Sequence, residues 1–583
     1  MPESYEAVIA VEGTRFIQLQ RSFGDVIKAR PVQRGDFVVM SNNPQGDRFW
    51  LKIQDSNWLV SLLDGRRKPI PIKGSSPFWF SPNGKYLVYY DIQRHQYFSY
   101  YVDSDKIKLI SAGLPSSVFA RHNEFRHPIN KPRDPQVSEC VGLAGWPEDS
   151  NYVFVYSDHD IWRLDLQGGA RPINVTNGFG QKHSVKFRFL TRSQQPLLDL
   201  PLTQPLLLTA FNPNTKENGF YQVVLGGSGD PTLLTMGPYT YFHSNLGVMN
   251  PVMFDNGQIP IKAKDANVWI VKRQSGRESP NFYLTRDFKV YKPLTTIHPE
   301  QAYNWLNPTL IGWMQPDGNV TQGILYKPDN FDPAKRYPVI FVVYEQLSQR
   351  LHQFPNPDYA GAFINIPWFV SRGYLVFTPD IHFVVPKKGA SALLTVSSGV
   401  KALAKYRYVD TSKLAIVGHS YSGVMINYIV THSSLFSASI AGAGASDAIS
   451  SALQLNGAGL EKGGSSLGLT EYRMGVSIWD RPDMYLSESP ILNAHKVTTP
   501  LLLFHSMIDG LPWEQALEMF TALRRLGKMT WLIQYDDAGH EANGKDAEDY
   551  SKRITQYFDH YLKGERPPIW MTRGIRYSQR GIE

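Results

Sequence analysis

KLAIVGHSYSGVM, residues 413–425, joins a run of apolar residues to a turn that holds a serine between glycines. The pattern G-x-S-x-G marks a sharp strand-to-helix turn that exposes a serine hydroxyl. In this chain Ser422 stands where that pattern has its second glycine, and Gly423 follows. Because serine adds only a hydroxymethyl group, we expect the turn to tolerate Ser422. Ser420 is therefore a candidate nucleophile.

The sequence from residue 301 to residue 583 alternates apolar, strand-like runs with helical stretches. The runs are YPVIFVVY (337–344), GYLVFTPD (373–380), KLAIVGHS (413–420), PLLLFHSMID (500–509) and TWLIQYDD (530–537). Near-continuous apolar strands are typical of a parallel sheet that is covered on both faces. ALLTVSSGVKALAKY (392–406) and EQALEMFTALRRLG (514–527) are the clearest helical stretches between them. This alternation predicts a doubly wound α/β domain with a mostly parallel sheet.

Two later strand ends offer partners for the serine. A serine hydroxyl is a weak nucleophile until a base removes its proton. In strand-turn-helix sites of this kind, the acid and then the histidine follow the serine along the chain. Asp509 ends one apolar strand, and His540 follows the last one. Asp536 and Asp537 are poorer candidates for the orienting acid because they lie in the histidine's own segment. We therefore predict Ser420, Asp509 and His540 as the catalytic residues.

Residues 1–300 are composed of short strands broken by turn residues. Aromatic or β-branched runs of strand length are FVVM (37–40), YLVYY (86–90), YVFVY (152–156) and PLLLTAF (205–211). They recur at roughly 40- to 60-residue intervals, which is the blade period of a β-propeller with loop insertions. We predict an all-β propeller domain over residues 1–300. An irregular array of β-sandwiches is the alternative.

The composition excludes several classes of protein. Hydrophobic residues make up 42% and charged residues 19% of 583 residues, as in a well-packed chain with more than one domain. The net charge is +8, but basic residues form short, separated groups such as GRRKP (65–69) and LRRLGK (523–528). No nucleic acid is therefore expected as a partner. Cys140 is the only cysteine, so no intrachain disulfide can form. No run approaches 18 apolar residues, so no membrane span is expected.

Taken together, these stretches resemble the prolyl oligopeptidase family of serine peptidases, whose bacterial members include dipeptidyl and acylaminoacyl peptidases. The stretches that carry the resemblance are YSDHDIWRLDLQGGARPINVTNGFG (156–180), TQGILYKPDNFDPAKRYPVIFVVY (321–344), GHSYSG (418–423), SPILNAHKVTTPLLLFHSMIDGLPWEQALEMFTALRRLGK (489–528), DAGH (537–540) and FDHYLKGERPPIWM (558–571). The resemblance implies a propeller domain (1–300) followed by an α/β-hydrolase domain (301–583). It also implies Ser420 as nucleophile, His540 as general base and Asp509 as its orienting acid.

The family pattern further implies an oxyanion hole made by the backbone N–H of Tyr421 and the hydroxyl of Tyr344. The chain departs from the family pattern beside Tyr344 and in two features that bear on substrate recognition. YEQLSQRLHQF (344–354) replaces a glycine-rich continuation, and AGAGASDAISSALQ (441–454) stands where dipeptidyl peptidases carry an aromatic cluster that grips proline. We also find no convincing counterpart of the paired-glutamate motif that those enzymes carry in the propeller. Prolyl or dipeptidyl specificity is therefore not inferred.

We expect a serine peptidase that forms an acyl-enzyme with oligopeptides and needs no cofactor and no metal. The propeller of the family implies that folded proteins are excluded. Alternatives are an esterase on the same fold and a catalytically silent binding protein.

A homo-oligomer is a possible assembly. Exported and cytoplasmic locations both stay open, since family relatives are often exported while the first residues, MPESYEAVIAVEGTRF, lack the features of a signal peptide. A truncated or processed chain is compatible with this.

Overall fold

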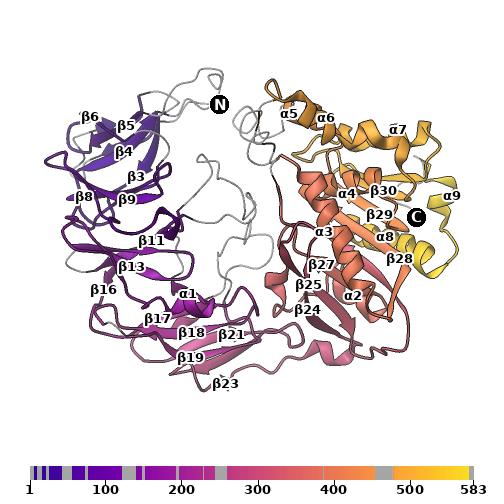
Figure 1. Ribbon diagram of the computed structural model, residues 1–583, viewed down its shortest axis with the longest axis horizontal. Helices are drawn as coiled ribbons and strands as arrows, with labels where there is room; N and C mark the ends of the chain where they lie inside the picture. Colours follow the sequence, from indigo (N-terminus) through magenta and orange to yellow (C-terminus); the bar gives the residue numbers. More distant parts are fainter. Residues whose placement is uncertain are drawn as a thin grey trace. The chain divides into compact units, whose positions relative to one another are not determined.

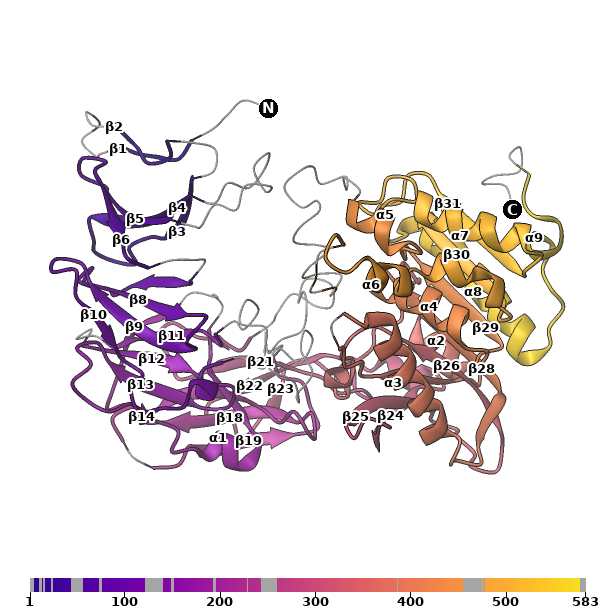
Figure 2. The same ribbon diagram turned by 45° about the horizontal axis from the view of Figure 1, so that its top comes forward.

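The computed structural model describes residues 5–9, 13, 16–21, 25–42, 56–72, 76–120, 140–147, 151–191, 196–227, 229–242, 259–384, 386–453, 474, 476 and 478–576. The chain folds into two compact units (Figures 1 and 2). The first consists of Met1–Asn123, Asn130–Arg273 and Phe282–Leu294. The second contains Gln274–Asn281 and Thr295–Glu583. The domain boundary between residues 300 and 301 stays a prediction.

The described residues of the first unit form a strand pair and five sheets of four or five strands. The pair is β1 (Ala7–Ile9) with β2 (Phe16–Gln18). The first two sheets consist of β3 (Asp25–Ala29), β4 (Phe37–Asn42), β5 (Ser56–Ser61) and β6 (Arg67–Ile70), and of β7 (Phe78–Phe80), β8 (Tyr86–Asp91), β9 (Gln96–Tyr101) and β10 (Ile107–Leu109). The third sheet consists of β11 (Leu143–Pro147), β12 (Tyr152–Tyr156), β13 (Ile161–Asp165), β14 (Ile173–Asn174) and β16 (Leu197–Leu200). The last two consist of β15 (Lys186–Phe189), β17 (Leu206–Phe211), β18 (Asn218–Val223) and β19 (Thr232–Gly237), and of β20 (Ile261–Lys262), β21 (Trp269–Arg273), β22 (Asn281–Thr285) and β23 (Lys292–Pro293). The four strands predicted from aromatic and β-branched runs lie in β4, β8, β12 and β17.

Successive sheets of the first unit pack face to face through apolar side chains. One buried cluster joins residues of β4 and β5, such as Leu59, to residues of β7, β8 and β9, such as Leu87. The next cluster joins β8 and β9 to β11, β12 and β13 around Trp146. Further clusters join β12 to β15, β17 and β18, and β18 to β21. Successive sheets thus pack against one another in chain order, as propeller blades do. The predicted propeller is confirmed.

The second unit is built on an eight-stranded sheet with the order β24-β25-β27-β26-β28-β29-β30-β31. β24 (Leu306–Met314) and β25 (Val320–Pro328) form an antiparallel hairpin at one edge, and β25 is antiparallel to β27. The parallel strands are β26 (Tyr337–Val342), β27 (Leu375–Pro379), β28 (Val409–His419), β29 (Ala438–Gly442), β30 (Leu501–Ser506) and β31 (Thr530–Tyr535). The five apolar runs identified in the sequence form the core of this sheet.

Helices cover both faces of the sheet, which explains why its strands are apolar throughout (Figure 1). The helices are α2 (Ile366–Ser371), α3 (Lys388–Leu403), α4 (Tyr421–His432), α5 (Ala448–Leu453), α6 (Pro482–Ser487), α7 (Glu514–Arg525), α8 (Gly544–Lys563) and α9 (Ile569–Arg573). One core contains side chains of α2 and α8, including Phe369 and Tyr557. The other contains side chains of α3, α4 and α7, including Val396, Ile426 and Met519. The predicted α/β-hydrolase architecture is confirmed.

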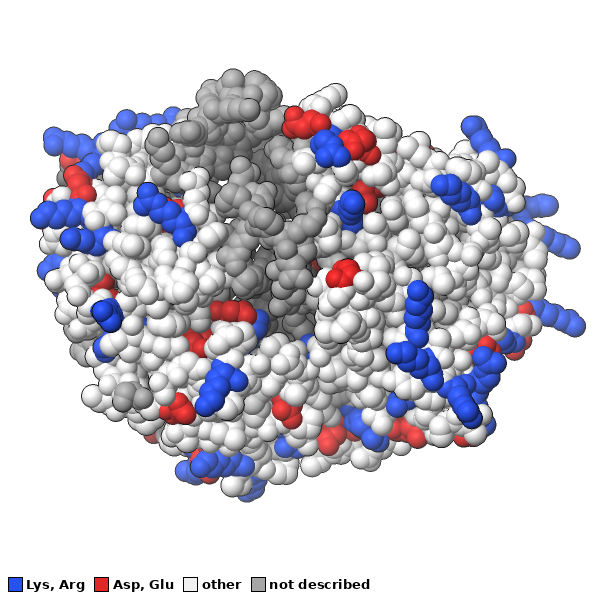
Figure 3. All heavy atoms as spheres, in the orientation of Figure 1, with Lys and Arg blue, Asp and Glu red and all other residues white. Residues whose placement is uncertain are grey.

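Short helices complete the described chain. They are α1 (Phe179–His183) and the 3-10 helices η1 (Ser116–Val118), η3 (Pro299–Ala302), η4 (Ser348–Arg350) and η6 (Pro490–Lys496). No helix among the described residues is both long enough and apolar enough to span a membrane. On the face drawn in Figure 3, Lys and Arg side chains lie in small groups with Asp and Glu among them.

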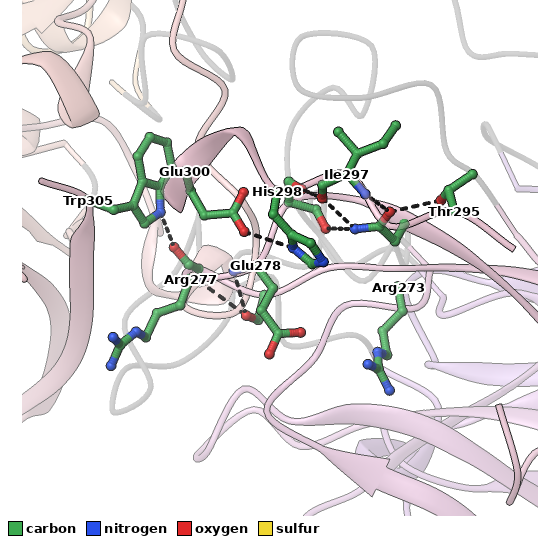
Figure 4. Close-up of polar contacts among 12 residues, drawn as sticks. Arg273, Arg277, Glu278, Thr295, Ile297, His298, Glu300 and Trp305 are labelled. Atoms are coloured by element: carbon green, nitrogen blue, oxygen red, sulfur yellow. Dashed lines mark hydrogen bonds and ion pairs between the residues drawn. The ribbon is translucent and has the colours of Figure 1, made fainter. Parts of the chain in front are cut away.

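Two segments before the sheet belong to the second unit, and hydrogen bonds of the Asn281 side chain connect them. Figure 4 labels Thr295, Ile297 and Trp305 in this region. Its amide oxygen accepts hydrogen bonds from Ile297 N and Thr295 Oγ1, both at 2.8 Å. Its amide nitrogen donates to Ile297 O at 2.8 Å. Trp305 Nε1 donates to Gly276 O at 3.1 Å, which fixes the start of the second segment to the first. Gln274–Asn281 is therefore an integral part of the second unit.

Candidate active site

Three candidate residues lie where parallel strands end. Ser420 follows β28, Asp509 lies beyond β30, and His540 lies beyond β31. These strands occupy neighbouring positions in the sheet, with only β29 between β28 and β30. Because parallel strands have their carboxyl ends at one edge, the sheet carries all three residues to that edge. Residues that lie far apart in the sequence are therefore brought to the same edge of the sheet.

Ser420 adopts a strained backbone conformation between β28 and α4. Its dihedral angles are φ 60° and ψ −124°, a region that residues with a side chain seldom occupy. Such strain costs of the order of 1–3 kcal/mol and persists only when neighbouring contacts hold it. Here Ser420 N donates to Gly442 O at 2.8 Å, which fixes the turn against the end of β29. Among the described residues, Ser420 Oγ makes no hydrogen bond, so its proton is not committed to another acceptor.

Asp509 and His540 form a bifurcated hydrogen bond, in which one N–H is shared by both carboxylate oxygens. His540 Nδ1 lies 2.9 Å from Oδ1 and 3.0 Å from Oδ2 of Asp509. Since a carboxylate can only accept, Nδ1 carries the proton, and Nε2 is left with the lone pair that a general base needs. The carboxylate side chain is 1% exposed, whereas the imidazole is 34% exposed and accessible to substrate.

A second histidine also contacts the carboxylate. His505 Nε2 lies 3.4 Å from Asp509 Oδ2 and 3.2 Å from Leu511 O. Leu511 N donates to Asp509 Oδ1 at 2.9 Å. Burial by itself raises the pKa of Asp509, but the hydrogen bonds from His505 and His540 outweigh it and hold that pKa well below 3.8. Asp509 is therefore ionised at neutral pH. His505 is not among the residues predicted from the sequence.

The pKa of His540 is shifted in the opposite direction. Burial of the ring lowers it, but the hydrogen bond and the charge of Asp509 outweigh burial and raise the pKa above 6.5. An imidazolium cannot accept a proton, so a raised pKa keeps the ring inactive up to a higher pH. The pair is thus suited to take a proton from a hydroxyl when the ring is neutral.

Residues 387–565 match the prolyl oligopeptidase family. This part of the chain, which lies within the second unit, is therefore similar to that family. Among curated relatives, the uncharacterized peptidase YuxL of Bacillus subtilis is 25% identical over 249 residues, which cover 40% of this chain and 35% of the relative. Dipeptidyl-peptidase 5 of Porphyromonas gingivalis is 24% identical over 247 residues, covering 39% of this chain and 34% of the relative. The matches thus span about a third of the length of these relatives.

The solved structures extend the similarity to the whole fold. Dipeptidyl peptidase 4 of Porphyromonas gingivalis aligns with a TM-score of 0.63 at 15% identity, covering 94% of this chain and 79% of that chain. At this identity the likeness shows the fold alone. It agrees with the propeller and the α/β-hydrolase unit described above. The fold of that structure therefore matches both halves of the chain.

Tyr344 lies two residues beyond β26, at the sheet edge that carries Ser420. Its ring is half-buried and packs edge-on against Phe363 at 5.7 Å, and Phe363 packs against His419 at 6.0 Å. Tyr421 is the first residue of α4 and directly follows Ser420. Both residues thus follow strands of the sheet at the edge that carries Ser420, and their role in an oxyanion hole stays a prediction.

The segment after Tyr344 lacks the family's glycines but is held by a buried carboxylate. Asp380, which is 5% exposed, accepts hydrogen bonds at 2.8 Å from the backbone N–H groups of Leu347 and Ser348. The hydroxyl of Ser348 donates to the other oxygen of Asp380. These contacts fix the loop to the end of β27. A fixed loop lets Tyr344 be positioned without the glycine-rich sequence.

Ser422, the departure within the G-x-S-x-G pattern, is fully buried and bonded to the end of β28. Its Oγ donates to His419 O and accepts from His419 N, both at 2.8 Å. The helix packs tightly against the sheet at Gly423, where a Cβ would lie 2.3 Å from Gly442 O. Close packing therefore demands glycine at 423, while position 422 accommodates serine. The expected tolerance of Ser422 agrees with this geometry.

We expect Ser422→Gly to retain kcat/KM within about tenfold, because Ser422 contacts backbone rather than reacting atoms. The two lost hydrogen bonds and the added helix glycine should lower the free energy of unfolding by about 1–3 kcal/mol. Thermal melting and steady-state kinetics of the variant beside the parent measure both effects. A hundredfold gain in activity would contradict this account, because it would show that Ser422 suppresses catalysis.

The SDHDIW segment (157–162) carries metal-capable side chains, but its contacts are structural. Asp158 pairs with Lys186 at 2.9 Å. Asp160 is 3% exposed and accepts hydrogen bonds from Thr176 Oγ1, Gly180 N and Gln181 N at 2.6–3.0 Å. These bonds hold the loop around α1. Among the described residues, no group of three His, Cys, Asp or Glu could hold a metal ion.

Proposed function

We propose that the chain is a serine peptidase that cleaves oligopeptides through an acyl-enzyme formed on Ser420. The observation that carries this proposal is the Asp509–His540 pair, with Nδ1 bound at 2.9 Å, beside a serine on a strained strand-to-helix turn. The likeness to the prolyl oligopeptidase family and to a curated dipeptidyl-peptidase supports peptide bonds as the substrate class.

In the proposed reaction, His540 Nε2 takes the proton of Ser420 as Oγ attacks the scissile carbonyl carbon. The resulting oxyanion accepts hydrogen bonds from the N–H of Tyr421 and the hydroxyl of Tyr344. The tetrahedral adduct then collapses, and the leaving amine takes the proton from His540. A water molecule repeats the sequence at the acyl-enzyme, which releases the acid and restores Ser420. Asp509 stays ionised throughout and stabilises the imidazolium.

An esterase would use the same residues, and a silent binding protein would use none of them. We expect the purified chain to react with a fluorophosphonate probe at Ser420 and to cleave members of a diverse peptide library, with products read by mass spectrometry. Short peptide amides and p-nitrophenyl esters, assayed side by side, separate the first two alternatives. Labelling with hydrolysis of esters alone would favour the esterase, and absence of labelling would favour the silent protein.

The pH dependence provides a further prediction. We expect kcat/KM to fall as pH decreases through the pKa of His540, with a midpoint above 6.5. The sign follows because protonation removes the base and Asp509 favours the protonated form. Rates measured from about pH 5 to about pH 9 locate the midpoint. A midpoint at or below 6.5 would argue against the Asp509–His540 pairing in the free enzyme.

A further inference from the structure

His419, the residue before Ser420, contacts the loop that carries His540. It is the last residue of β28 and is 1% exposed. Its Nε2 lies 2.8 Å from the carbonyl oxygen of His540, and the two rings lie 4.8 Å apart between centroids. The contact joins positions 121 residues apart in the sequence. It is a direct link between the strand that ends at the nucleophile and the loop that holds the base.

The hydrogen bond defines the tautomer of His419. A carbonyl oxygen can only accept, so Nε2 carries the proton. Nδ1 is buried and has no hydrogen-bond partner among the described residues. A second proton on Nδ1 would therefore be buried without an acceptor, and burial lowers the pKa of His419 to about 3. The ring stays neutral at neutral pH and keeps its donor on Nε2.

Packing fixes the orientation of this ring. Phe504 and Phe363 lie 5.7 Å and 6.0 Å from it between centroids. A Cβ at position 442 would lie 2.5 Å from Nδ1 of His419, so Gly442 provides the space that the imidazole occupies. The hydroxyl of Ser422 holds the backbone of His419 by two hydrogen bonds. Side chain and backbone are therefore both immobilised.

We propose that His419 is a positioning residue for the base: its Nε2–H holds the carbonyl of His540 and so sets the imidazole relative to Ser420. Asp509 fixes the rotation of the His540 ring through Nδ1, but it does not fix the backbone from which that ring projects. His419 supplies this second restraint from the residue adjacent to the nucleophile. The inference rests on the proposed function.

The alternative is that His419 only fills space in the core. The positioning role and the space-filling role predict different effects on kcat when a shorter hydrogen-bond donor replaces His419. Nε2 of a glutamine can reach the position of the histidine Nε2, whereas the amide of an asparagine ends near the position of Nδ1. His419→Gln and His419→Asn are therefore matched polar variants that differ in reach. Misplacement of a catalytic group by about 1 Å can cost about 100-fold in rate.

We expect His419→Asn to lower kcat by about 10- to 100-fold with KM within about threefold, and His419→Gln to retain kcat within about fivefold. Rates are taken per active site, titrated with a fluorophosphonate, so that only folded molecules count. Thr499→Val is the control, because it removes another buried hydrogen bond, from Thr499 Oγ1 to Phe436 O at 3.0 Å. Thr499 lies before the start of β30, at the sheet edge opposite to the loop that carries His540. The kcat of this variant should match that of the parent.

Three outcomes would overturn the proposal. Equal losses in His419→Asn and His419→Gln would show that the imidazole fills space and that its donor is not used. A kcat per active site that is unchanged in His419→Asn would show that the contact does not position the base. A parent that neither reacts with the probe nor hydrolyses peptide would contradict the proposed function itself, and the inference would fall with it.

Discussion

Ser420→Ala is expected to lower kcat by about 10⁶-fold while leaving the fold intact. The hydroxyl is the atom that becomes acylated, so no neighbouring group can replace it. Ser420 Oγ makes no hydrogen bond among the described residues, and the strained backbone is held by its N–H bond to Gly442 O at 2.8 Å, which alanine keeps. The melting temperature should therefore stay close to that of the parent. The effect is measured as kcat of the variant and of the parent on a library peptide that the parent cleaves.

Ser433→Ala is the matched control, because Ser433 caps the opposite end of the same helix and its hydroxyl accepts a hydrogen bond from Leu435 N at 3.1 Å. Its activity should equal that of the parent. Hydrolysis by Ser420→Ala within about tenfold of the parent would remove Ser420 from the mechanism, since no general acid–base route on this site accounts for so small a loss.

Asp509→Asn is expected to lower kcat by about 10⁴-fold, the loss seen when an amide replaces the acid of a serine triad. An asparagine can present N–H₂ to Nδ1 of His540 and so favour the tautomer with its proton on Nε2, which cannot act as a base. The substitution also removes the charge that raises the pKa of His540. The remaining activity should therefore show an acid limb displaced to lower pH. Steady-state kinetics over a pH series test both expectations.

Asp536→Asn and Asp537→Asn are the controls for this assignment. Asp536 Oδ1 accepts from Gln534 Nε2 at 3.1 Å, on the same segment as the histidine. Both variants should retain kcat within about tenfold. A severe loss in either, combined with a mild effect of Asp509→Asn, would mean that the orienting acid has been assigned to the wrong residue.

The strands, and the order in which they carry the candidate residues, could be predicted from the sequence. A strand that is buried on both faces is apolar at successive positions, and such a run is easily recognised. The runs that became β28, β30 and β31 are apolar at successive positions, and each ends in a polar residue. A parallel sheet brings such ends together whatever lies between them in the chain. Ser420, Asp509 and His540 could therefore be chosen as candidates before any contact was known.

The contacts that hold those residues could not be predicted in the same way. His419 bonds to a backbone carbonyl 121 residues away, and backbone carbonyls leave no mark in a sequence. His505 precedes Asp509 by four residues but reaches it only because the chain turns after β30. For Ser422, local reasoning indicated tolerance, but its two bonds to His419 depend on how closely the helix meets the strand. A histidine directly before the nucleophile is the only signal that could have drawn attention to His419.

The hydrogen bonds of the Asn281 side chain determine how this chain can be divided into fragments. Gln274–Asn281 belongs to the second unit, but Phe282–Leu294 returns to the first before the chain continues at Thr295. A gene fragment that starts at Thr295 would leave Ile297 N without its acceptor and Trp305 Nε1 without Gly276 O. From the viewpoint of the second unit, Phe282–Leu294 is an insertion. Autonomous production of that unit therefore calls for a start at Gln274 and a short bridge in place of the inserted residues.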